Sequence, residues 1–422
     1  TEFGRKQIGD LGVGAKDVVF TITEGGETSF VIGTAWKGLE AGAKVYFVYN
    51  NPDDILCQHV TRSREVLQEP RIEKINLTTG PMSITGSTRM QATTIQLCVL
   101  LTVLEMVLRD LMKELEPQGP DALDSTTVPA EFLKRLVEIH ESLKSPWLLS
   151  QLAGAVALEE TVYRSRRKNN YFADRFGIDV LTDTTERSPT YCTPPFRKCY
   201  DTTATESWAF LFLPYRDTPQ AWERLIKRQP KCVEWTEQEV RALVSGDKVA
   251  RTCEIVRKIS AAELMRFQVG LDGLKCRPLG KGDSAVGIIA EAEKASLLSA
   301  DGFHRRQLEA AQKAGASIGL IYVGRQESLG EISGFLAKWS SECVAVLAPV
   351  PKTDFLLDGV TRVGLKMLLN ALSTCTMVRL GRVMGNYMIW VVPSNLKLID
   401  RSTRYIQRLT DLDYQAANRL LF

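Results

Sequence analysis

Short apolar runs alternate with amphipathic stretches in the amino-terminal part of the chain. Residues 17–23 (DVVFTIT) form an apolar run, and residues 24–28 (EGGET) form a glycine-rich turn after it. Residues 29–42 have a helical pattern, and residues 44–51 (KVYFVYNN) form a second apolar run. This order of strand, turn, helix and strand is a βαβ unit, which predicts a parallel sheet with right-handed crossovers.

The next stretch predicts a third strand, a polar loop and a long helix. The strand begins near residue 74 (KINL), the loop contains TTGPMSITGSTRM, and the helix covers residues 92–115. Residues 116–129 are rich in Pro, Gly, Asp and Ser, which predicts a break between two parts of the chain. Pro129 suits the first turn of the helix that follows this break.

Strand and helix patterns alternate again after the break. Residues 130–163 have helical patterns, and long helices are expected from residue 361 onward. The apolar runs that predict strands are residues 178–181 (IDVL), 208–214 (WAFLFLP), 285–290 (AVGIIA), 317–324 (SIGLIYVG) and 343–351 (CVAVLAPVP). The predicted fold class is therefore α/β, with parallel sheets flanked by helices.

A weak internal repeat suggests that the chain holds two related domains. Residues 86–112 open with GSTR and run into an apolar helix, and residues 359–384 open with GVTR and do the same. The match is loose, but the two regions of alternating strands and helices agree with it. A chain of 422 residues is also long enough for two domains.

Composition and charge exclude several classes of protein. Hydrophobic residues make up 44% and charged residues 24%, as in a soluble globular protein, and the net charge of +3 does not favour nucleic-acid binding. The longest apolar run, residues 95–108, is shorter than the roughly 18 residues that span a membrane. No phosphate-loop or dinucleotide fingerprint is present, so we expect no cofactor.

The nine cysteines and three histidines give no metal-binding pattern. The cysteines form no C-x-x-C pair and their number is odd, so we expect reduced thiols in an intracellular setting. Cys98 and Cys375 lie in apolar helical patterns, where a thiol packs as a small hydrophobic group. The histidines, His59, His140 and His304, are far apart in sequence, and no zinc-type spacing links them.

The turn TEGGETS, residues 23–29, is the first candidate binding segment. Gly25 and Gly26 would let the backbone approach a ligand, while Thr28 and Ser29 place hydroxyls at a helix start. Backbone N–H groups at a helix start suit a phosphate. An ordinary turn with a capping residue explains the same sequence, and the negative charges of the two glutamates in this turn argue against the binding of an anion.

The segment TGSTRM, residues 85–90, is the second candidate. Ser87 and Thr88 either cap the predicted helix or bind a phosphate or a sugar hydroxyl. Arg89 supports the second alternative, because its guanidinium pairs with anions.

The polar run TDTTERSPTY, residues 182–191, follows the predicted strand at residues 178–181. Polar residues beyond the carboxyl end of a parallel strand lie where open α/β sheets bind ligands. Thr184, Thr185 and Ser188 would then face a ligand, and Glu186 would act as a general acid or base if burial raises its pKa. A ligand loop and a plain loop are both open alternatives. Arg187 would instead keep Glu186 ionised by pairing with it.

Lys366 is the fourth candidate, because it lies within the apolar helical stretch VGLKMLLNALSTC. A lysine in such a stretch either extends its ammonium group to solvent or meets an anion.

Three segments resemble the sugar isomerase (SIS) domains of the N-acetylmuramic acid 6-phosphate etherase and glucokinase regulatory protein group. These segments are TGSTRMQATT, LTDTTERSPTY and residues 365–401. The third is the most specific, although Cys375 and Arg382 stand where the family has Gly and Lys. The resemblance implies parallel sheets flanked by helices that bind phosphosugars, with two such domains in tandem in the regulatory proteins.

The resemblance also assigns roles to residues. It places Gly25, Gly26, Thr28 and Ser29 in a sugar-phosphate loop that lacks the family's Ser and Arg. It places Ser87, Thr88 and Arg89 in the family's G-S-[ST]-R motif, and Lys366 on the helix lysine that contacts the sugar phosphate. Glu186 falls on a catalytic glutamate of the etherases if DTTERSPTY matches their D-A-S-E-C-P-P-T-Y segment. The second glutamate of that family is not found.

The resemblance implies four regions. Residues 1–115 match the later half of a first SIS domain, residues 116–129 a linker, residues 130–400 a second SIS domain, and residues 401–422 the start of a helical, lid-like region. A half domain would leave a sheet edge and apolar faces uncovered. We therefore expect either a missing amino-terminal segment or a second copy of the chain to complete it.

The expected function is a phosphosugar sensor that regulates a sugar kinase. The alternatives are an etherase-like lyase or phosphosugar isomerase that uses Glu186, and a scaffold whose sugar sites have lapsed. The expected partners are a phosphosugar and a sugar kinase, with no nucleic acid, membrane or metal. The expected location is the cytoplasm, with the nucleus as the alternative.

Overall fold

The computed structural model describes residues 1–115, 124–393 and 396–422, so most of the predicted linker lies outside the described residues. The chain divides into two compact units. Unit 1 contains Thr1–Met82, Thr88–Leu97 and Arg228–Arg266, and unit 2 contains Ser83–Ser87, Cys98–Lys227 and Phe267–Phe422. Each unit is described by itself below. The predicted domain boundaries remain a prediction, and the units divide the chain differently from them.

Unit 1 is built on a small parallel sheet. Its strands are β1 (Val18–Ile22), β2 (Lys44–Tyr49) and β3 (Ile72–Asn76), paired in the order β1-β2-β3. Its core includes Ile32, Val45, Phe47 and Leu56. The helices that accompany these strands are α1 (Glu2–Asp10), α2 (Ser29–Glu40), α3 (Asp53–His59) and α4 (Thr61–Gln68).

Residues 228–266 also belong to unit 1. They form α10 (Glu237–Leu243), α11 (Lys248–Arg257) and α12 (Ala261–Leu264). A cluster of Val240, Val249, Cys253 and Val256 packs against Phe3 and Trp235, which links these helices to the amino-terminal helix.

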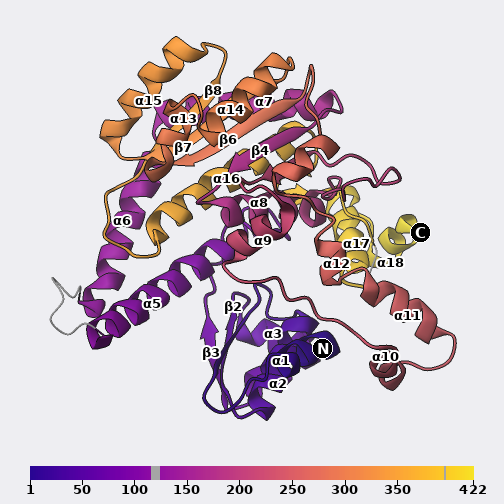
Figure 1. The fold of residues 1–422 in the computed structure, drawn as a ribbon. Coiled ribbons are helices and arrows are strands. Elements are labelled where there is room, and N and C mark those ends of the chain that lie inside the picture. The colour runs from indigo at the N-terminus through magenta and orange to yellow at the C-terminus, as the bar shows by residue number, and fades with distance from the viewer. Residues whose placement is uncertain (116–123, 394–395) are drawn as a thin grey trace. The chain divides into compact units, whose positions relative to one another are not determined.

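Unit 2 contains a five-stranded parallel sheet (Figure 1). Its order is β5 (Ala209–Phe212), β4 (Asn169–Ala173), β6 (Ser284–Ala290), β7 (Ser317–Gly324) and β8 (Val344–Pro349). The chain passes from β4 to β5 on one side and returns to β6 on the other. The order of strands therefore reverses between β4 and β6, which is where open α/β sheets bind ligands.

Helices cover both faces of this sheet. Leu158 of α7 (Pro146–Arg164) lies near Val286 of β6, while Leu308 of α14 (Phe303–Lys313) lies near the next residue, Gly287. Successive strand residues point to opposite faces, so these two helices lie on opposite sides of the sheet. The predicted α/β class with parallel sheets flanked by helices is confirmed.

The other long helices carry most of the residues discussed below. They are α5 (Ala92–Leu115), which begins in unit 1 and continues in unit 2, and, within unit 2, α6 (Val128–Leu143), α8 (Gly177–Tyr191), α9 (Thr218–Ile226), α15 (Gln326–Trp339), α16 (Gly359–Arg379), α17 (Leu396–Thr410) and α18 (Tyr414–Leu421). A short antiparallel pair, β9 (Val383–Met384) and β10 (Tyr387–Met388), follows α16.

The predicted strand at residues 178–181 is wrong. These residues belong to α8, and the strand before it is β4 at Asn169–Ala173. The buried residues Val180, Thr184, Arg187 and Tyr191 recur every three or four positions, which is the period of a helix. The predicted polar loop at residues 182–191 is wrong for the same reason.

The cysteines differ in part from expectation. Cys199 and Cys276 are joined as a disulfide, with their Cα atoms 5.5 Å apart, whereas the sequence predicted only reduced thiols. Because 77 residues separate these two cysteines, the sequence gives no sign that they are close in space. Cys98 is buried as predicted, but Cys375 is exposed. No helix in the described ranges is long and apolar enough to cross a membrane.

Candidate ligand site at the strand ends of unit 2

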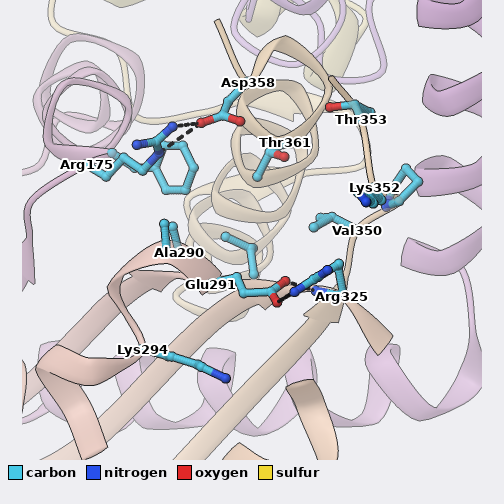
Figure 2. A pocket seen from close by; sticks show the side chains of 14 residues that line it. Arg175, Ala290, Glu291, Lys294, Arg325, Val350, Lys352, Thr353, Asp358 and Thr361 are labelled. Atoms are coloured by element: carbon cyan, nitrogen blue, oxygen red, sulfur yellow. Dashed lines mark hydrogen bonds and ion pairs between the residues drawn. The ribbon is translucent and has the colours of Figure 1, made fainter. Parts of the chain in front are cut away.

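A cavity of about 460 Å³ lies at the carboxyl ends of four strands of unit 2. Residues that follow β4, β6, β7 and β8 line it, together with the first turn of α16. We call it the strand-end cavity (Figure 2). Its place, beside the reversal of strand order, matches the position of ligand sites in open α/β sheets.

Two ion pairs border the strand-end cavity (Figure 2). Arg175, which follows β4, donates from Nε to Oδ2 of Asp358 at 2.8 Å. Arg325, which follows β7, donates from Nε to Oε1 of Glu291 at 2.7 Å. The Arg325 guanidinium lowers the pKa of Glu291, so this carboxyl group stays ionised. Both arginines are about half exposed and can meet a ligand without leaving their partners.

The lining of the strand-end cavity carries an excess of positive charge. Arg175, Lys294, Arg325 and Lys352 are cationic, and Glu291 and Asp358 are its acidic residues. Lys294 pairs with a carboxylate outside the lining, at 2.7 Å. No residue of the described chain forms an ion pair with Lys352. The excess of two positive charges favours an anionic ligand.

Two helices begin at this cavity. Asp358 is the residue before α16 and Arg325 is the residue before α15, and Thr361 lies in the first turn of α16. The first N–H groups of a helix lack partners within the helix, and the helix dipole is positive at that end. These donors add to the charge of the side chains in attracting an anion.

Glu293 holds two of the strand ends together. It accepts hydrogen bonds from the backbone N–H of Arg175 at 3.0 Å and from that of Ala290 at 2.9 Å. Burial raises the pKa of Glu293. Its role is therefore to position Arg175 beside the end of β6.

Two of the three hydroxyl groups predicted to face a ligand, those of Thr184 and Thr185, are bonded within α8. Thr184 donates to the carbonyl oxygen of Val180 at 2.8 Å, and Thr185 donates to that of Leu181 at 2.7 Å. Glu186 is half-buried on the same helix. None of these residues lines the strand-end cavity.

The charged residues of α8 form a buried network instead. Arg187 donates to Asp183 at 2.8 Å and to Glu159 of α7 at 3.2 Å. Glu159 also accepts a hydrogen bond from Asn169 at 3.1 Å. All three charged side chains are almost fully buried. Arg187 therefore joins α8 to α7 and has a structural role.

Lys366 lies next to this network. Its ammonium group donates to Oδ1 of Asn370 at 2.8 Å, and Asn370 donates to Asp183 at 3.0 Å. Hydrogen bonds thus connect Lys366 to α8 through Asn370, although the two were predicted as separate candidate sites. Lys366 does not line the strand-end cavity.

The TEGGETS turn lies between β1 and α2, as the sequence predicted. Gly26 has a positive φ of 70°, and a Cβ there would lie 2.7 Å from a side-chain carbon of Leu56. Ser63 donates to the carbonyl oxygen of Gly26 at 2.7 Å, and Asn51 donates to that of Gly25 at 3.0 Å. The hydroxyl groups of Thr28 and Thr23 are 2.8 Å apart. Ser29 is the first residue of α2 and is exposed.

The TGSTRM segment lies between β3 and α5. Ser87 and Arg89 are buried, whereas Thr88 is half-buried. Ser87 belongs to unit 2, and the two residues after it belong to unit 1. The Ser87 hydroxyl has no hydrogen-bond partner in the described part of the chain.

Ser188 lines a second cavity, of about 400 Å³, at the carboxyl end of α8. Of the predicted site residues, Ser188 is the one that lines any of four cavities found among the described residues. Among the residues that the structure describes, no group of three His, Cys, Asp or Glu side chains is arranged to hold a metal ion.

The residues of the strand-end cavity were not predicted as site residues, although the sequence carries a signal for them. Glu291, Arg325 and Lys352 directly follow the predicted strands at residues 285–290, 317–324 and 343–351. The strand-end rule, applied to these three strands, would have found them. It was applied instead to residues 178–181, which are helical.

Comparisons with known proteins give relatives that share one name. No model of a protein family matches the chain. N-acetylmuramic acid 6-phosphate etherase from Prochlorococcus marinus (strain MIT 9303) is 28% identical over 256 residues, which cover 54% of this chain and 78% of that protein. The protein of the same name from Listeria monocytogenes serotype 4b (strain CLIP80459) is 30% identical over 184 residues, which cover 44% of this chain and 56% of that protein.

A solved structure, the C-terminal domain of glucosamine-fructose-6-phosphate aminotransferase from Francisella tularensis, also matches. Its TM-score is 0.45 and its identity is 13%, with 86% of this chain and 71% of that chain covered.

The fold of unit 2 defines an α/β protein with a parallel sheet flanked by helices. The etherase similarity supports the assignment of the chain to the SIS-domain proteins of the group that contains the N-acetylmuramic acid 6-phosphate etherases.

Proposed function

We propose that the chain binds a phosphosugar, with the phosphate in the strand-end cavity. One observation carries this proposal: the cavity lies at the reversal of strand order and has four cationic side chains against two acidic ones. The name of the etherase relatives, which includes a sugar phosphate, supports the same class of ligand.

The chemistry of the lining suits both parts of such a ligand. The phosphate would be bound by Lys352, Arg175 and the first N–H groups of α16. Glu291 and Asp358 are ionised acceptors that sugar hydroxyls can reach. A volume of about 460 Å³ lies within the usual range for small-molecule sites.

A thermal-shift screen tests the class of ligand. A sugar phosphate at about 100 times its Kd should stabilise the protein by about 2.7 kcal/mol. Glucosamine 6-phosphate, N-acetylmuramic acid 6-phosphate and fructose 6-phosphate are compared with the unphosphorylated sugars and inorganic phosphate. Failure of every sugar phosphate to raise the melting temperature would contradict the proposal and favour a scaffold with lapsed sugar sites.

An etherase-like lyase is the finer function that we propose. The relatives carry the etherase name, and this similarity supports a lyase more than a regulator of a sugar kinase. The resemblance places Glu186 on a catalytic glutamate, and this residue is half-buried one turn before the end of α8. The acid–base role of Glu186 and the sugar contacts of Ser87, Thr88, Arg89 and Lys366 remain predictions.

Turnover of N-acetylmuramic acid 6-phosphate tests the lyase. We expect release of lactate by the wild-type protein, and loss of that release in Glu186→Gln with binding retained. The matched control is Glu237→Gln, on the exposed face of α10. An inactive wild-type protein that still binds the sugar phosphate would reject the lyase and leave the binding proposal standing.

A further inference from the structure

The second cavity of unit 2 has a chemistry different from that of the strand-end cavity. It lies between the carboxyl end of α8, residues 388–392 and α17, and we call it the α8-end cavity. Its volume is about 400 Å³. Most of its lining is apolar, and the largest apolar side chain is that of Trp390.

Trp390 forms a fixed aromatic wall of this cavity. The guanidinium of Arg382 lies over its ring, 4.0 Å from the ring centre. Arg382 also donates to the carbonyl oxygen of Cys192 at 3.1 Å, and the Cys192 thiol donates to that of Trp390 at 3.1 Å. These contacts tie Trp390 to the end of α8, through its main-chain carbonyl and, by way of Arg382, through its ring. Trp390 is nevertheless 49% exposed, so about half of its side-chain surface stays open to solvent.

Arg401 of α17 supplies the charge of the α8-end cavity. It is the one charged residue in the lining, so no carboxylate of the lining opposes it. Its guanidinium packs against Gly86, where a Cβ would lie 3.1 Å from it. In the described ranges, no side chain forms an ion pair with Arg401. Three hydroxyl groups, those of Ser188, Thr190 and Thr193, complete the polar part of the lining.

We propose that the α8-end cavity binds a small organic anion with an aromatic or aliphatic body and one carboxylate. The apolar walls and the Trp390 ring would hold the body, and Arg401 would pair with the carboxylate. A mostly apolar cavity of this size with a few polar groups is typical of a small-molecule site. Because its lining carries one positive charge, it suits a monoanion better than a phosphate dianion.

Isothermal titration calorimetry with 4-phenylbutyrate tests this site. We expect saturable binding of one molecule per chain, and at least tenfold weaker binding of the neutral 4-phenylbutyramide. Arg401→Met should weaken 4-phenylbutyrate binding at least tenfold. The matched control is Arg404→Met, because Arg404 lies on the same helix, is exposed and pairs with Asp400 outside the cavity.

The outcomes separate this site from the strand-end cavity and from other occupants. Lys352→Met should leave 4-phenylbutyrate binding unchanged. The proposal is overturned if no binding occurs up to 1 mM, or if the amide and the carboxylate bind equally. Displacement of 4-phenylbutyrate by glucosamine 6-phosphate would also overturn it, as would a dimer in solution that dissociates when Trp390→Ala is introduced. The comparison of amide and carboxylate uses the wild-type chain, so it does not depend on the folding of a variant.

Discussion

Arg187 shows why a polar run can be predicted wrongly as a ligand loop when the partners of its side chains are distant in sequence. Its carboxylate partners are Asp183, four residues away, and Glu159, 28 residues away on α7. The first partner follows from helical spacing once the helix is known. The second depends on how two helices pack, which no local pattern reveals. Thr184 and Thr185 therefore bond within α8, whereas Ser188 lines a cavity at the end of that helix.

Removing Arg187 should strongly destabilise unit 2. In Arg187→Met, Asp183 and Glu159 would remain as buried charges without their cation, at a cost of about 3–5 kcal/mol. Urea denaturation measures this loss. The control is Arg241→Met, because Arg241 also pairs with a carboxylate four residues away but is exposed. It should change the free energy of unfolding by less than about 1 kcal/mol, and an equal loss in both variants would reject the structural role of Arg187.

His304 predicts a dependence of stability on pH. It is buried, its Nδ1 lies 2.9 Å from the Ser296 hydroxyl, and burial lowers its pKa from 6.5 to about 4. Between these values the unfolded chain takes up a proton that the folded chain does not. The stability that neutral His304 contributes is thus complete above pH 6.5 and is lost as the pH falls toward 4, by about 3 kcal/mol in total.

Urea denaturation at a series of pH values tests this effect by comparing the wild type with His304→Gln. The difference in unfolding free energy between them should shrink as the pH falls from 6.5 to 4. A difference that stays constant over this range would show that His304 does not titrate as expected.

The secondary structure could be predicted well where a strand forms a buried apolar run. The runs at residues 208–214, 317–324 and 343–351 contain β5, β7 and β8, and the run at residues 285–290 covers all but the first residue of β6. The helix predicted at residues 92–115 is α5. The prediction failed at residues 178–181 (IDVL) because a run of four mostly apolar residues is too short to distinguish a strand from the start of a helix. It also missed β4, whose residues Asn169 and Asn170 are polar yet fully buried.

Two glycines on helices should respond in opposite ways to alanine. A Cβ at Gly364 of α16 would lie 2.1 Å from Cδ1 of Ile139 on α6, so Gly364→Ala should destabilise unit 2 by about 1–3 kcal/mol. Gly330 of α15 has open space at that position, so Gly330→Ala should stabilise by up to about 1 kcal/mol. Thermal unfolding measures both, and stabilisation by Gly364→Ala would contradict the packing of α16 on α6.

The disulfide between Cys199 and Cys276 should contribute to stability. It closes a separation of 77 residues, for which loop entropy predicts about 4 kcal/mol. Peptide mapping without reduction should recover the two cysteines in one linked fragment, and Cys199→Ser should lower the melting temperature under oxidising conditions. Cys232→Ser is the control, since Cys232 is free in the structure. Two unlinked thiols in the native protein would contradict the pairing.

At the scale of the whole molecule, the α/β class and the similarity to the etherase group could be predicted from the sequence, whereas the division into two units could not. Residues 228–266 pack against Phe3 of the amino-terminal helix α1 through Val240 and Trp235, although more than 200 residues separate the two segments in the sequence. The cavity of unit 2 also required the structure, because Arg175, Arg325 and Lys352 meet only when the strand order is known. The fold thus gathers a cationic site from residues that no single motif contains.

The most direct test of the phosphosugar proposal is calorimetric titration of glucosamine 6-phosphate into the wild type, Lys352→Met and Lys338→Met. Lys352 lines the strand-end cavity. Lys338 lies in the last turn of α15, whereas the strand-end cavity lies at the first turn of that helix. We predict that Lys352→Met weakens binding about tenfold or more and that Lys338→Met leaves it unchanged. Equal affinity of all three proteins would contradict the placement of the phosphate in the strand-end cavity.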